Sequence, residues 1–386
     1  MHQAWMHLYS GSLGPAFAAF VLTLLTLYVI IPLAEQFGLV DRPGGRKTHA
    51  APTPAVGGAA ILLGSLPFAL TTFQLTPDLL ALAVAAVIVV GAGVWDDIRE
   101  LRWYVRLCAQ CAAGLALVYV GGVRVETIGS LFGASPVDLG VLSAPFTVLA
   151  TVGVMNAVNM ADGVDGLAGS LAAVALTMLT AAAIYSGNDR LGHGLLLLLS
   201  ALLAFLALNL RTPWRPKARV FLGNAGSEFL GLVIAWAAFR LTQNADHPVP
   251  AALAPFFIAL PVMDCLVLMV RRLRTGASPF AADRTHMHHY LMDAGWSATG
   301  TVILMCATSV MIGLAAAFAL QAGAPALWLV IVFLVLTVAY YIVSARRDRC
   351  LRLFRGLRRL GRQAVVTPSL APAYKADFYE SAAPRA

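Results

Sequence analysis

The chain is dominated by long apolar runs separated by short polar segments. Runs of about 17 to 22 residues begin near positions 14, 55, 79, 105, 141, 167, 194, 221, 250, 301 and 326. This is the length that a helix needs to cross a hydrocarbon core of about 30 Å. The pattern predicts an all-α polytopic membrane protein with about 11 transmembrane helices. We expect one multi-spanning domain over residues 1–345 and a basic tail over 346–386, flexible after about residue 364.

The amino-acid composition also indicates a membrane protein. Hydrophobic residues fill 59% of the 386 positions and charged residues 12%, and the mean hydropathy is +0.78. These values exclude an ordinary soluble globular protein.

The basic residues are distributed unevenly between alternate loops. One set of loops holds Arg42 to Lys47, Arg99, Arg102, Arg211 to Arg219, Arg271 to Arg274 and eight arginines from Arg346 to Arg362, whereas the other set holds Arg124 and Arg190. The positive-inside rule places the first set in the cytoplasm, so the N-terminus is expected outside and the C-terminus in the cytoplasm. The net charge of +8 therefore indicates topology and contact of the tail with anionic lipid, and no nucleic acid partner is expected.

The segment 156–168 is unusually polar for its position between two apolar runs. Its amides and carboxylates are those of Asn156, Asn159, Asp162 and Asp165. Because a charged side chain at bilayer depth costs several kcal/mol, such residues usually mark a pathway, a metal or a catalytic site. One continuous helix would turn them roughly half way round its axis, so we expect Gly163 and Gly166 to form a tight turn on which oxygens converge. A polar loop with capping side chains is the alternative.

Four further polar clusters fall on the same predicted face. They are Arg46, Lys47 and His49; Asp96 and Asp97; Asn224; and Arg284, His286, His288 and His289. Carboxylate and amide oxygens suit Mg²⁺, whereas cationic and histidine side chains suit phosphates. The histidines could alternatively bind zinc, but the nearby arginines favour an anion at this site. Helix termini, helix packing and topology explain each cluster alone, whereas their combination predicts phosphoryl transfer between a soluble and a lipid substrate.

Together and in this order, these motifs resemble the polyprenyl-phosphate N-acetylhexosamine-1-phosphate transferases of glycosyltransferase family 4. The matching segments are Asp41-x-Pro-x-x-Arg-Lys-x-His49, Asp96-Asp97, Asn156-x-x-Asn-x-x-Asp-Gly-x-Asp-Gly-Leu167, Phe221-x-Gly-x-x-Gly-Ser227 and Ser278-Pro-Phe-x-x-Asp-x-x-His-x-His-His289. The resemblance runs from about residue 20 to 345. Arg271-Arg272 and Asp293-Ala-Gly-Trp296 look more like the N-acetylglucosamine branch than the MurNAc-pentapeptide branch, which stays an alternative.

The resemblance implies a reaction. A polyprenyl phosphate, expected to be undecaprenyl phosphate, would attack the β-phosphate of a UDP-N-acetylhexosamine such as UDP-N-acetylglucosamine, releasing UMP. Direct displacement and a two-step route through an aspartyl intermediate both remain open. The product would start a lipid-linked cell-surface glycan, for example the O-antigen of lipopolysaccharide. The enzyme would sit in a bacterial inner membrane with its active site on the cytoplasmic face. A monomer and a homodimer both remain open.

The resemblance also implies residue roles. Catalytic roles would fall to Asp96, Asp97 and Asp162. Asp97, Asn159 and Asn224 would hold Mg²⁺, with Mn²⁺ as the alternative ion. Substrate binding would involve Arg46, Lys47, His49, Asp165, Arg284, His286, His288 and His289.

Two positions depart from the family pattern. Asn224 stands where the family usually has Asp, and Tyr104 where it usually has Lys. An amide oxygen ligates Mg²⁺ without adding charge, so we expect weaker metal affinity. A catalytically impaired homologue that binds lipid or UDP-sugar is therefore the alternative function. A carrier is less favoured, because no repeated halves are visible and the carboxylates lie at the ends of apolar runs.

Overall fold

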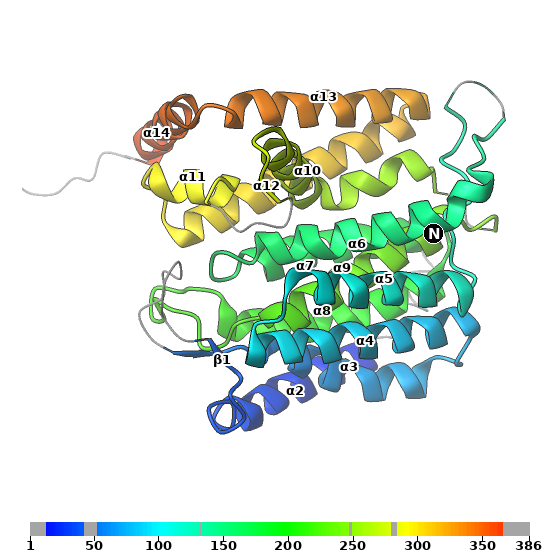
Figure 1. The fold of residues 1–386 in the computed structure, drawn as a ribbon, viewed down its shortest axis with the longest axis horizontal. Coiled ribbons are helices and arrows are strands. Elements are labelled where there is room, and N and C mark those ends of the chain that lie inside the picture. The colour runs from blue at the N-terminus through cyan, green and yellow to red at the C-terminus, as the bar shows by residue number, and fades with distance from the viewer. Residues whose placement is uncertain are drawn as a thin grey trace, which may run out of the picture.

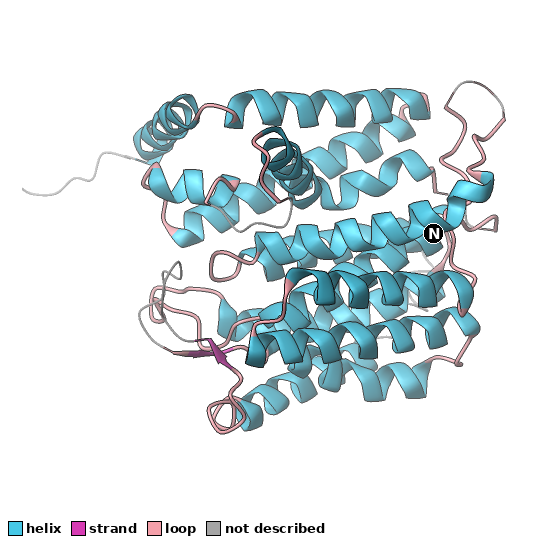
Figure 2. Ribbon diagram, viewed as in Figure 1, coloured by secondary structure: helices cyan, strands magenta, loops and turns pink. Residues whose placement is uncertain are grey.

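The computed structural model describes residues 13–41, 52–131, 133, 135–246, 249–278 and 284–365, with side chains described up to residue 359. Within these residues the chain forms thirteen α-helices, and the strands are limited to one pair of two residues each (Figures 1 and 2). The expected all-α class is confirmed.

Every predicted apolar run contains a helix. These helices are α2 (Leu13–Ile30), α3 (Gly57–Thr72), α4 (Pro77–Arg99), α5 (Trp103–Tyr119), α6 (Ser143–Ala161), α7 (Leu167–Tyr185), α8 (Asp189–Asn209), α9 (Gly223–Thr242), α10 (Ala259–Arg274), α12 (Ala298–Gln321) and α13 (Ala326–Ser344). The remaining elements are η1 (Gly140–Leu142), η2 (Ala251–Ile258), α11 (Met287–Asp293), α14 (Arg347–Val365), β1 (Val40–Asp41) and β2 (Thr53–Pro54).

The number of spanning helices differs from the prediction of about 11. Nine helices among the described residues are long and apolar enough to cross a membrane, with η2 and α10 counted together. The other two, α3 and α5, have 16 and 17 residues, which corresponds to only about 24–26 Å of helix. The protein is thus a polytopic membrane protein with nine candidate spans among the described residues. A membrane crossing by α3 and α5 stays a prediction, as does the orientation.

Helix α9 forms the centre of the bundle. It packs against α3, α4, α6 and α7, and 89% of the residues in its apolar stretch are buried, whereas the share in α13 is 6%. A helix that is hydrophobic all round and enclosed by others belongs to the core, whereas α13 presents most of its surface to lipid. The first turn of α9 is therefore surrounded by protein on most sides.

Two helices approach this first turn of α9 through glycines. A Cβ at Gly58 of α3 would lie 2.2 Å from the Cα of Gly226, and a Cβ at Gly93 of α4 would lie 2.4 Å from the Cα of Ala225. Small residues at helix crossings allow backbones to come this close in membrane bundles. The glycines thus bring the last turn of α4 to the start of α9.

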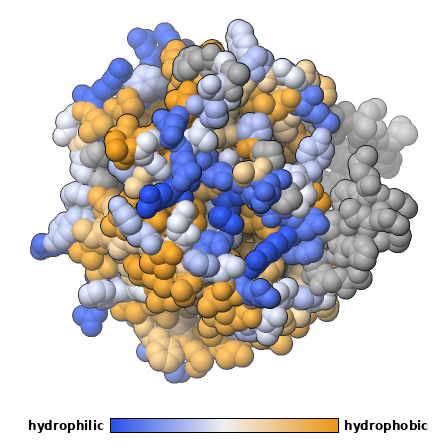
Figure 3. All heavy atoms as spheres, turned by 90° about the vertical axis from the view of Figure 1, so that its right-hand side faces the viewer, coloured by the Kyte–Doolittle hydropathy of each residue, from blue (hydrophilic) through white to orange (hydrophobic). Residues whose placement is uncertain are grey.

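The two ends of the bundle are polar and its circumference is apolar. In Figure 1, β1, α11 and α14 gather at the left end. Figure 3 looks onto the opposite end, where hydrophilic side chains occupy the middle and hydrophobic ones the rim. Exposed aromatic side chains occur near both ends of the helices, as is typical at membrane–water interfaces. They include Trp95, Trp103 and Trp214 at one end and Tyr119, Tyr185 and Trp328 at the other.

The glycine contact predicts a position-specific loss of stability. We expect Gly93→Ala to lower the thermal unfolding midpoint of the purified protein, because an added methyl group in a packed contact costs about 1–3 kcal/mol. Gly91→Ala, two residues earlier on the same helix, is the matched control, since nothing lies within 4 Å of a Cβ there. Equal midpoints for the two variants would contradict the described α4–α9 contact.

Candidate functional site

Asp96 lies in the last turn of α4, an end of a helix that disfavours negative charge. Its Oδ1 accepts a hydrogen bond from the Leu101 backbone nitrogen at 2.6 Å, and its Oδ2 accepts one from Arg106 Nη1 at 3.0 Å. The chain reaches Leu101 through Glu100, which adopts a left-handed conformation with φ of 49°. The buried carboxylate is thus held by the turn that follows it and by an arginine of α5.

Asp97 faces the N-terminus of α9. Its Oδ1 accepts a hydrogen bond from the backbone nitrogen of Asn224 at 3.0 Å, and its Oδ2 accepts a longer one from Ala225 at 3.4 Å. The positive end of the α9 dipole stabilises this carboxylate. Gly223 has φ of +75°, and a Cβ there would lie 2.7 Å from Asp97 Oδ2. Glycine at position 223 therefore permits the contact because it adopts this positive φ without strain and because it has no Cβ to displace the Asp97 carboxylate.

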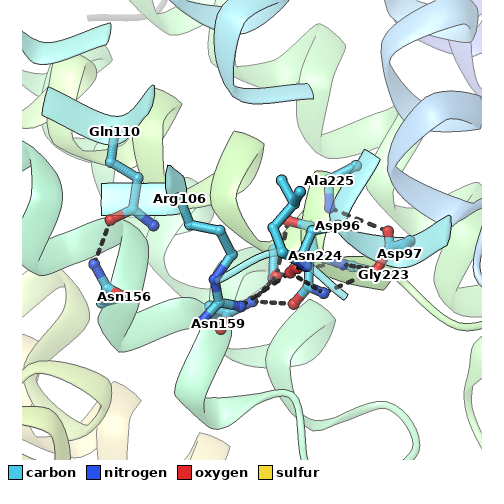
Figure 4. A network of polar contacts seen from close by, with 11 residues as sticks. Asp96, Asp97, Arg106, Gln110, Asn156, Asn159, Gly223, Asn224 and Ala225 are labelled. Carbon is cyan, nitrogen blue, oxygen red and sulfur yellow. Dashed lines mark hydrogen bonds and ion pairs between the residues drawn. The ribbon is translucent and has the colours of Figure 1, made fainter. Parts of the chain in front are cut away.

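Asn224 bridges the two carboxylates. Its Nδ2 donates to Asp96 Oδ2 at 2.8 Å and to Asp97 Oδ1 at 2.9 Å (Figure 4). Its Oδ1 accepts a hydrogen bond from Asn159 Nδ2 at 2.8 Å, and the same nitrogen donates to Ser227 Oγ at 2.9 Å. The three predicted metal ligands, Asp97, Asn159 and Asn224, therefore lie in one hydrogen-bonded cluster.

The donor set of this cluster fits a hard divalent cation. Two carboxylates and two amides contribute only oxygen ligands, which Mg²⁺ and Mn²⁺ accept. Among the described residues, no three histidine, cysteine or acidic side chains gather in a metal-binding arrangement, so amide oxygens would have to complete the coordination. The Asn224 nitrogen lies between the two carboxylates, where a cation would neutralise them. For Asn224 to ligate an ion there, its amide must turn its oxygen toward the carboxylates.

The polar segment after α6 forms the expected tight turn. Helix α6 ends at Ala161, α7 begins at Leu167, and Gly166 between them has φ of +83°. The Gly166 nitrogen donates to Asn209 Oδ1 at 2.9 Å. The turn is thus anchored to the end of α8.

Asp165 joins this turn to the 211–219 loop. Its Oδ2 accepts a hydrogen bond from Arg211 Nε at 2.7 Å and another from the Ala218 nitrogen at 3.1 Å. The carboxylate therefore has two partners within the protein, one of them charged.

Asp162 lies in the same turn, and its carboxylate has no hydrogen-bond or ion-pair partner among the described residues. Although its side chain reaches solvent, the surrounding protein disfavours the charged form and raises the pKa of Asp162 to about 7. Neighbouring carboxylates add to the shift by repulsion; they belong to Asp97, Asp165 and Asp41. The group can therefore exchange a proton near neutral pH.

The histidines at the start of α11 are oriented by two residues that the motifs did not indicate. His286 Nδ1 lies 2.8 Å from Asp264 Oδ2, and Tyr340 OH donates to Asp264 Oδ1 at 2.5 Å. Asp264 belongs to α10 and Tyr340 to α13, so two helices distant in sequence hold the His286 imidazole, α10 directly and α13 through Asp264. A single carboxylate and a single tyrosine inside apolar runs give little sequence signal beyond the general rarity of charge in spans.

His288 connects the histidine segment to the turn after α6. A Cβ at Gly163 would lie 2.3 Å from His288 Nε2, and the ring is 1% exposed, with no partner for either nitrogen among the described residues. Burial lowers the pKa of His288 to about 3, and the charges of His289 and His286 contribute to the shift. His288 is thus a neutral imidazole with one free donor and one free acceptor.

The remaining predicted residues lie in the histidine segment and in the first loop. Burial first, and then the charges of His286 and Arg284, lower the pKa of His289. Arg284 is exposed. Arg46, Lys47 and His49 lie outside the described residues.

A buried polar chain beside the carboxylates was not predicted. Asn156 Nδ2 donates to Gln110 Oε1 at 2.7 Å, and Gln110 is also hydrogen-bonded to Glu228. Glu228 is 2% exposed and interacts electrostatically with Arg106 and Asp96. The available sequence signal is a charged residue inside an apolar run, and the motif that ends at Ser227 stops just before Glu228.

The sequence is similar to proteins of known family. The family pattern that matches residues 79–242 is described as Glycosyl transferase family 4. An undecaprenyl-phosphate alpha-N-acetylglucosaminyl 1-phosphate transferase of Escherichia coli O157:H7 is 31% identical over 91% of this chain and 96% of its own length. Proteins with the same name from Salmonella typhi and Haemophilus influenzae are 29% and 32% identical, over 93% and 77% of this chain and 98% and 85% of their own lengths.

The Asn224 bridge predicts that stability and metal binding change in opposite directions at this position. In metal-free buffer that contains a chelator, Asn224→Asp should lower the free energy of unfolding by about 2–4 kcal/mol, because two hydrogen bonds to carboxylates are replaced by repulsion between three acidic groups. Saturating Mg²⁺ should raise the unfolding midpoint of the variant more than that of the wild type. Differential scanning fluorimetry in detergent measures both.

Asn188→Asp is the control for this substitution. Asn188 Oδ1 accepts a hydrogen bond from the Leu191 nitrogen at the start of α8, a helix N-cap position where aspartate is equally favourable. An Asn224→Asp protein that is as stable as wild type without metal would contradict the bridging role.

Proposed function

The chain belongs to glycosyl transferase family 4, and we propose that it transfers N-acetylglucosamine-1-phosphate, or a related N-acetylhexosamine-1-phosphate, from a UDP-sugar to undecaprenyl phosphate. The observation that carries this proposal is the pair of buried Asp96 and half-buried Asp97 at the polar end of the bundle, bridged by Asn224. The names of the relatives favour the lipid and the sugar. UMP is the second product, and the lipid-linked sugar starts a cell-surface glycan such as O-antigen.

An apolar groove supports a lipid acceptor. A cavity of about 480 Å³ lies between α5 and α6, and its lining includes Leu107, Cys111, Leu115, Tyr119, Val148 and Val152. It begins next to the polar cluster, because Leu107 follows Arg106 and the Val152 carbonyl accepts a hydrogen bond from Asn156. A hydrocarbon chain in this groove would keep its phosphate near the carboxylates. Burial of apolar surface would stabilise such binding.

Asp97, Asn159 and Asn224 would hold the metal, with Mg²⁺ as the expected ion and Mn²⁺ as the alternative. When bound, the ion would neutralise charge on the diphosphate of the sugar donor. The reaction joins an oxygen of the lipid phosphate to the β-phosphorus and breaks the bond from that phosphorus to the bridging oxygen. The electron pair leaves with UMP.

Acidic side chains would control the proton of the lipid phosphate. A phosphate monoester loses its second proton near pH 6, so a carboxylate with a pKa of about 7 is matched to accept it. Asp162 has such a pKa. Asp96 and Asp97 would position the acceptor, and Arg106 would hold Asp96 in place.

The sugar nucleotide would bind from the loop side. Asp165, held by Arg211, would contact uridine, and Arg284 with His286, His288 and His289 would contact the diphosphate or the sugar. Arg46, Lys47 and His49 of the first loop would add phosphate ligands. We place this site on the cytoplasmic face of a bacterial inner membrane, in agreement with the basic loops.

A binding homologue with impaired chemistry is the second candidate function. It is favoured by Asn224, because the amide fills the position between the carboxylates and carries no charge. The same experiment separates it from the transferase.

We expect purified protein in detergent to release UMP from UDP-N-acetylglucosamine only with undecaprenyl phosphate and a divalent cation. Asp97→Asn should reduce kcat by about 100-fold or more, because a proposed metal ligand is lost. Asp138→Asn, in the loop at the other end, should retain wild-type activity. If the wild type releases no UMP but the Asn224→Asp variant does, the protein is the binding homologue. Competition between UDP-N-acetylglucosamine and UDP-N-acetylgalactosamine would identify the preferred sugar.

The pH dependence of kcat should report Asp162. As the pH falls below about 7, its carboxylate becomes protonated, and kcat should fall about tenfold per pH unit. Asp165→Asn should move this limb to lower pH, because it removes a negative charge that raises the Asp162 pKa. If the acidic limb of the kcat–pH profile of Asp165→Asn lies at the same pH as in the wild type, the proton transfer belongs to a different group.

A further inference from the structure

Helix α14 lies across the direction of the spanning helices. It follows α13 directly, and in Figure 1 it is viewed nearly along its axis at the left end of the bundle, whereas α13 runs horizontally. The segment 346–362 contains eight arginines and one acidic residue, Asp348. The helix is therefore a cationic element at the polar end of the protein, oriented across the bundle.

The faces of α14 differ in character. Cys350, Leu351 and Phe354 are buried against the protein, whereas Leu353 and Leu357 are 48% and 43% exposed. At about 100° per residue these two leucines extend the apolar face beyond the part that packs on the protein. The exposed arginines Arg349, Arg352 and Arg359 follow next around the helix. An apolar edge beside a cationic face is typical of helices that lie in a membrane interface.

Three contacts join α14 to the turn between α11 and α12. Trp296 Nε1 donates to the Phe354 carbonyl at 3.0 Å, and Arg347 forms an ion pair with Asp293 at 2.8 Å. Gly295 has φ of +92°, and a Cβ there would lie 2.4 Å from the Arg358 guanidinium. The turn directly follows the helix that carries His288 and His289. A displacement of α14 would therefore move residues 293–296 and, through them, the helix that carries the histidines.

We propose that α14 binds the anionic phospholipid headgroups of the surrounding leaflet and thereby positions the 286–289 segment. Its exposed arginines pair with lipid phosphates, while Leu353 and Leu357 enter the acyl boundary. A soluble nucleotide or acidic peptide offers no apolar phase for these leucines, whereas a membrane surface offers both. The second half of the proposal rests on the proposed function, because it assigns substrate binding to the histidines.

The lipid half is tested with the full-length protein in nanodiscs of phosphatidylcholine, with or without phosphatidylglycerol. We expect phosphatidylglycerol to raise the unfolding midpoint of the wild type, and the triple variant Arg349→Gln, Arg352→Gln, Arg359→Gln to lose at least about half of this rise. The matched control removes three exposed charges at the same end, Arg99→Gln, Lys217→Gln and Arg219→Gln, and should retain the rise. An equal rise in the α14 variant, or a rise of the same size from inorganic phosphate that the α14 variant also loses, would overturn binding of a lipid surface.

The coupling half is tested with Trp296→Phe, which removes the hydrogen bond to Phe354 and keeps an aromatic ring. The variant should keep the phosphatidylglycerol-dependent midpoint but bind UDP-N-acetylglucosamine several-fold more weakly, with KM raised and kcat almost unchanged. Ile303→Ala on the exposed side of α12 should behave as wild type. An unchanged nucleotide affinity in Trp296→Phe would overturn the coupling. Calorimetric binding of the nucleotide decides this even in a protein without turnover, so failure of the proposed function stays distinguishable.

Discussion

The placing of two adjacent carboxylates, one buried and one half-buried, at the C-terminal end of a helix is the constraint on which the rest of this site depends. Asp96 and Asp97 gain nothing from the α4 dipole, and neither can be left unpaired inside the bundle. Their stabilisation comes from elsewhere: backbone nitrogens at the start of α9, the Asn224 amide and the Arg106 guanidinium. Each partner requires that α4, α5 and α9 meet closely. The glycines at the α3–α9 and α4–α9 crossings therefore serve the electrostatics of the site as much as the packing of the bundle.

The part of the site formed by the histidines is organised by different contacts. There one histidine is held by a carboxylate and another is placed by close packing. Asp264 and Tyr340 fix His286, and the ring of His288 fills the space that Gly163 leaves open. The carboxylate half and the histidine half meet at the turn between α6 and α7. Small displacements of this turn would alter both.

Much of the fold was predictable because the length and spacing of apolar runs follow directly from bilayer thickness. All eleven runs contain helices, and Gly163 and Gly166 correctly indicated the turn after α6. Helix lengths were less predictable, since α3 and α5 have only 16 and 17 residues, at or below the shortest expected run. Asp264, Gln110 and Glu228 were missed because their significance arises from partners on other helices. The Asn224 bridge was likewise invisible, because a sequence identifies an amide and not the direction in which it points. For Arg46, Lys47 and His49 the prediction stands as made.

The Asn224 bridge also bears on how quickly the site can respond to its environment. The two carboxylates are already held together by an uncharged group, so no helix has to move to assemble them. For the proposed ion to bind there, one side-chain amide would rotate, a far smaller event than the microsecond-to-millisecond motions of whole helices. Occupation of the site would therefore depend on the local concentration of the cation and not on a rearrangement of the bundle.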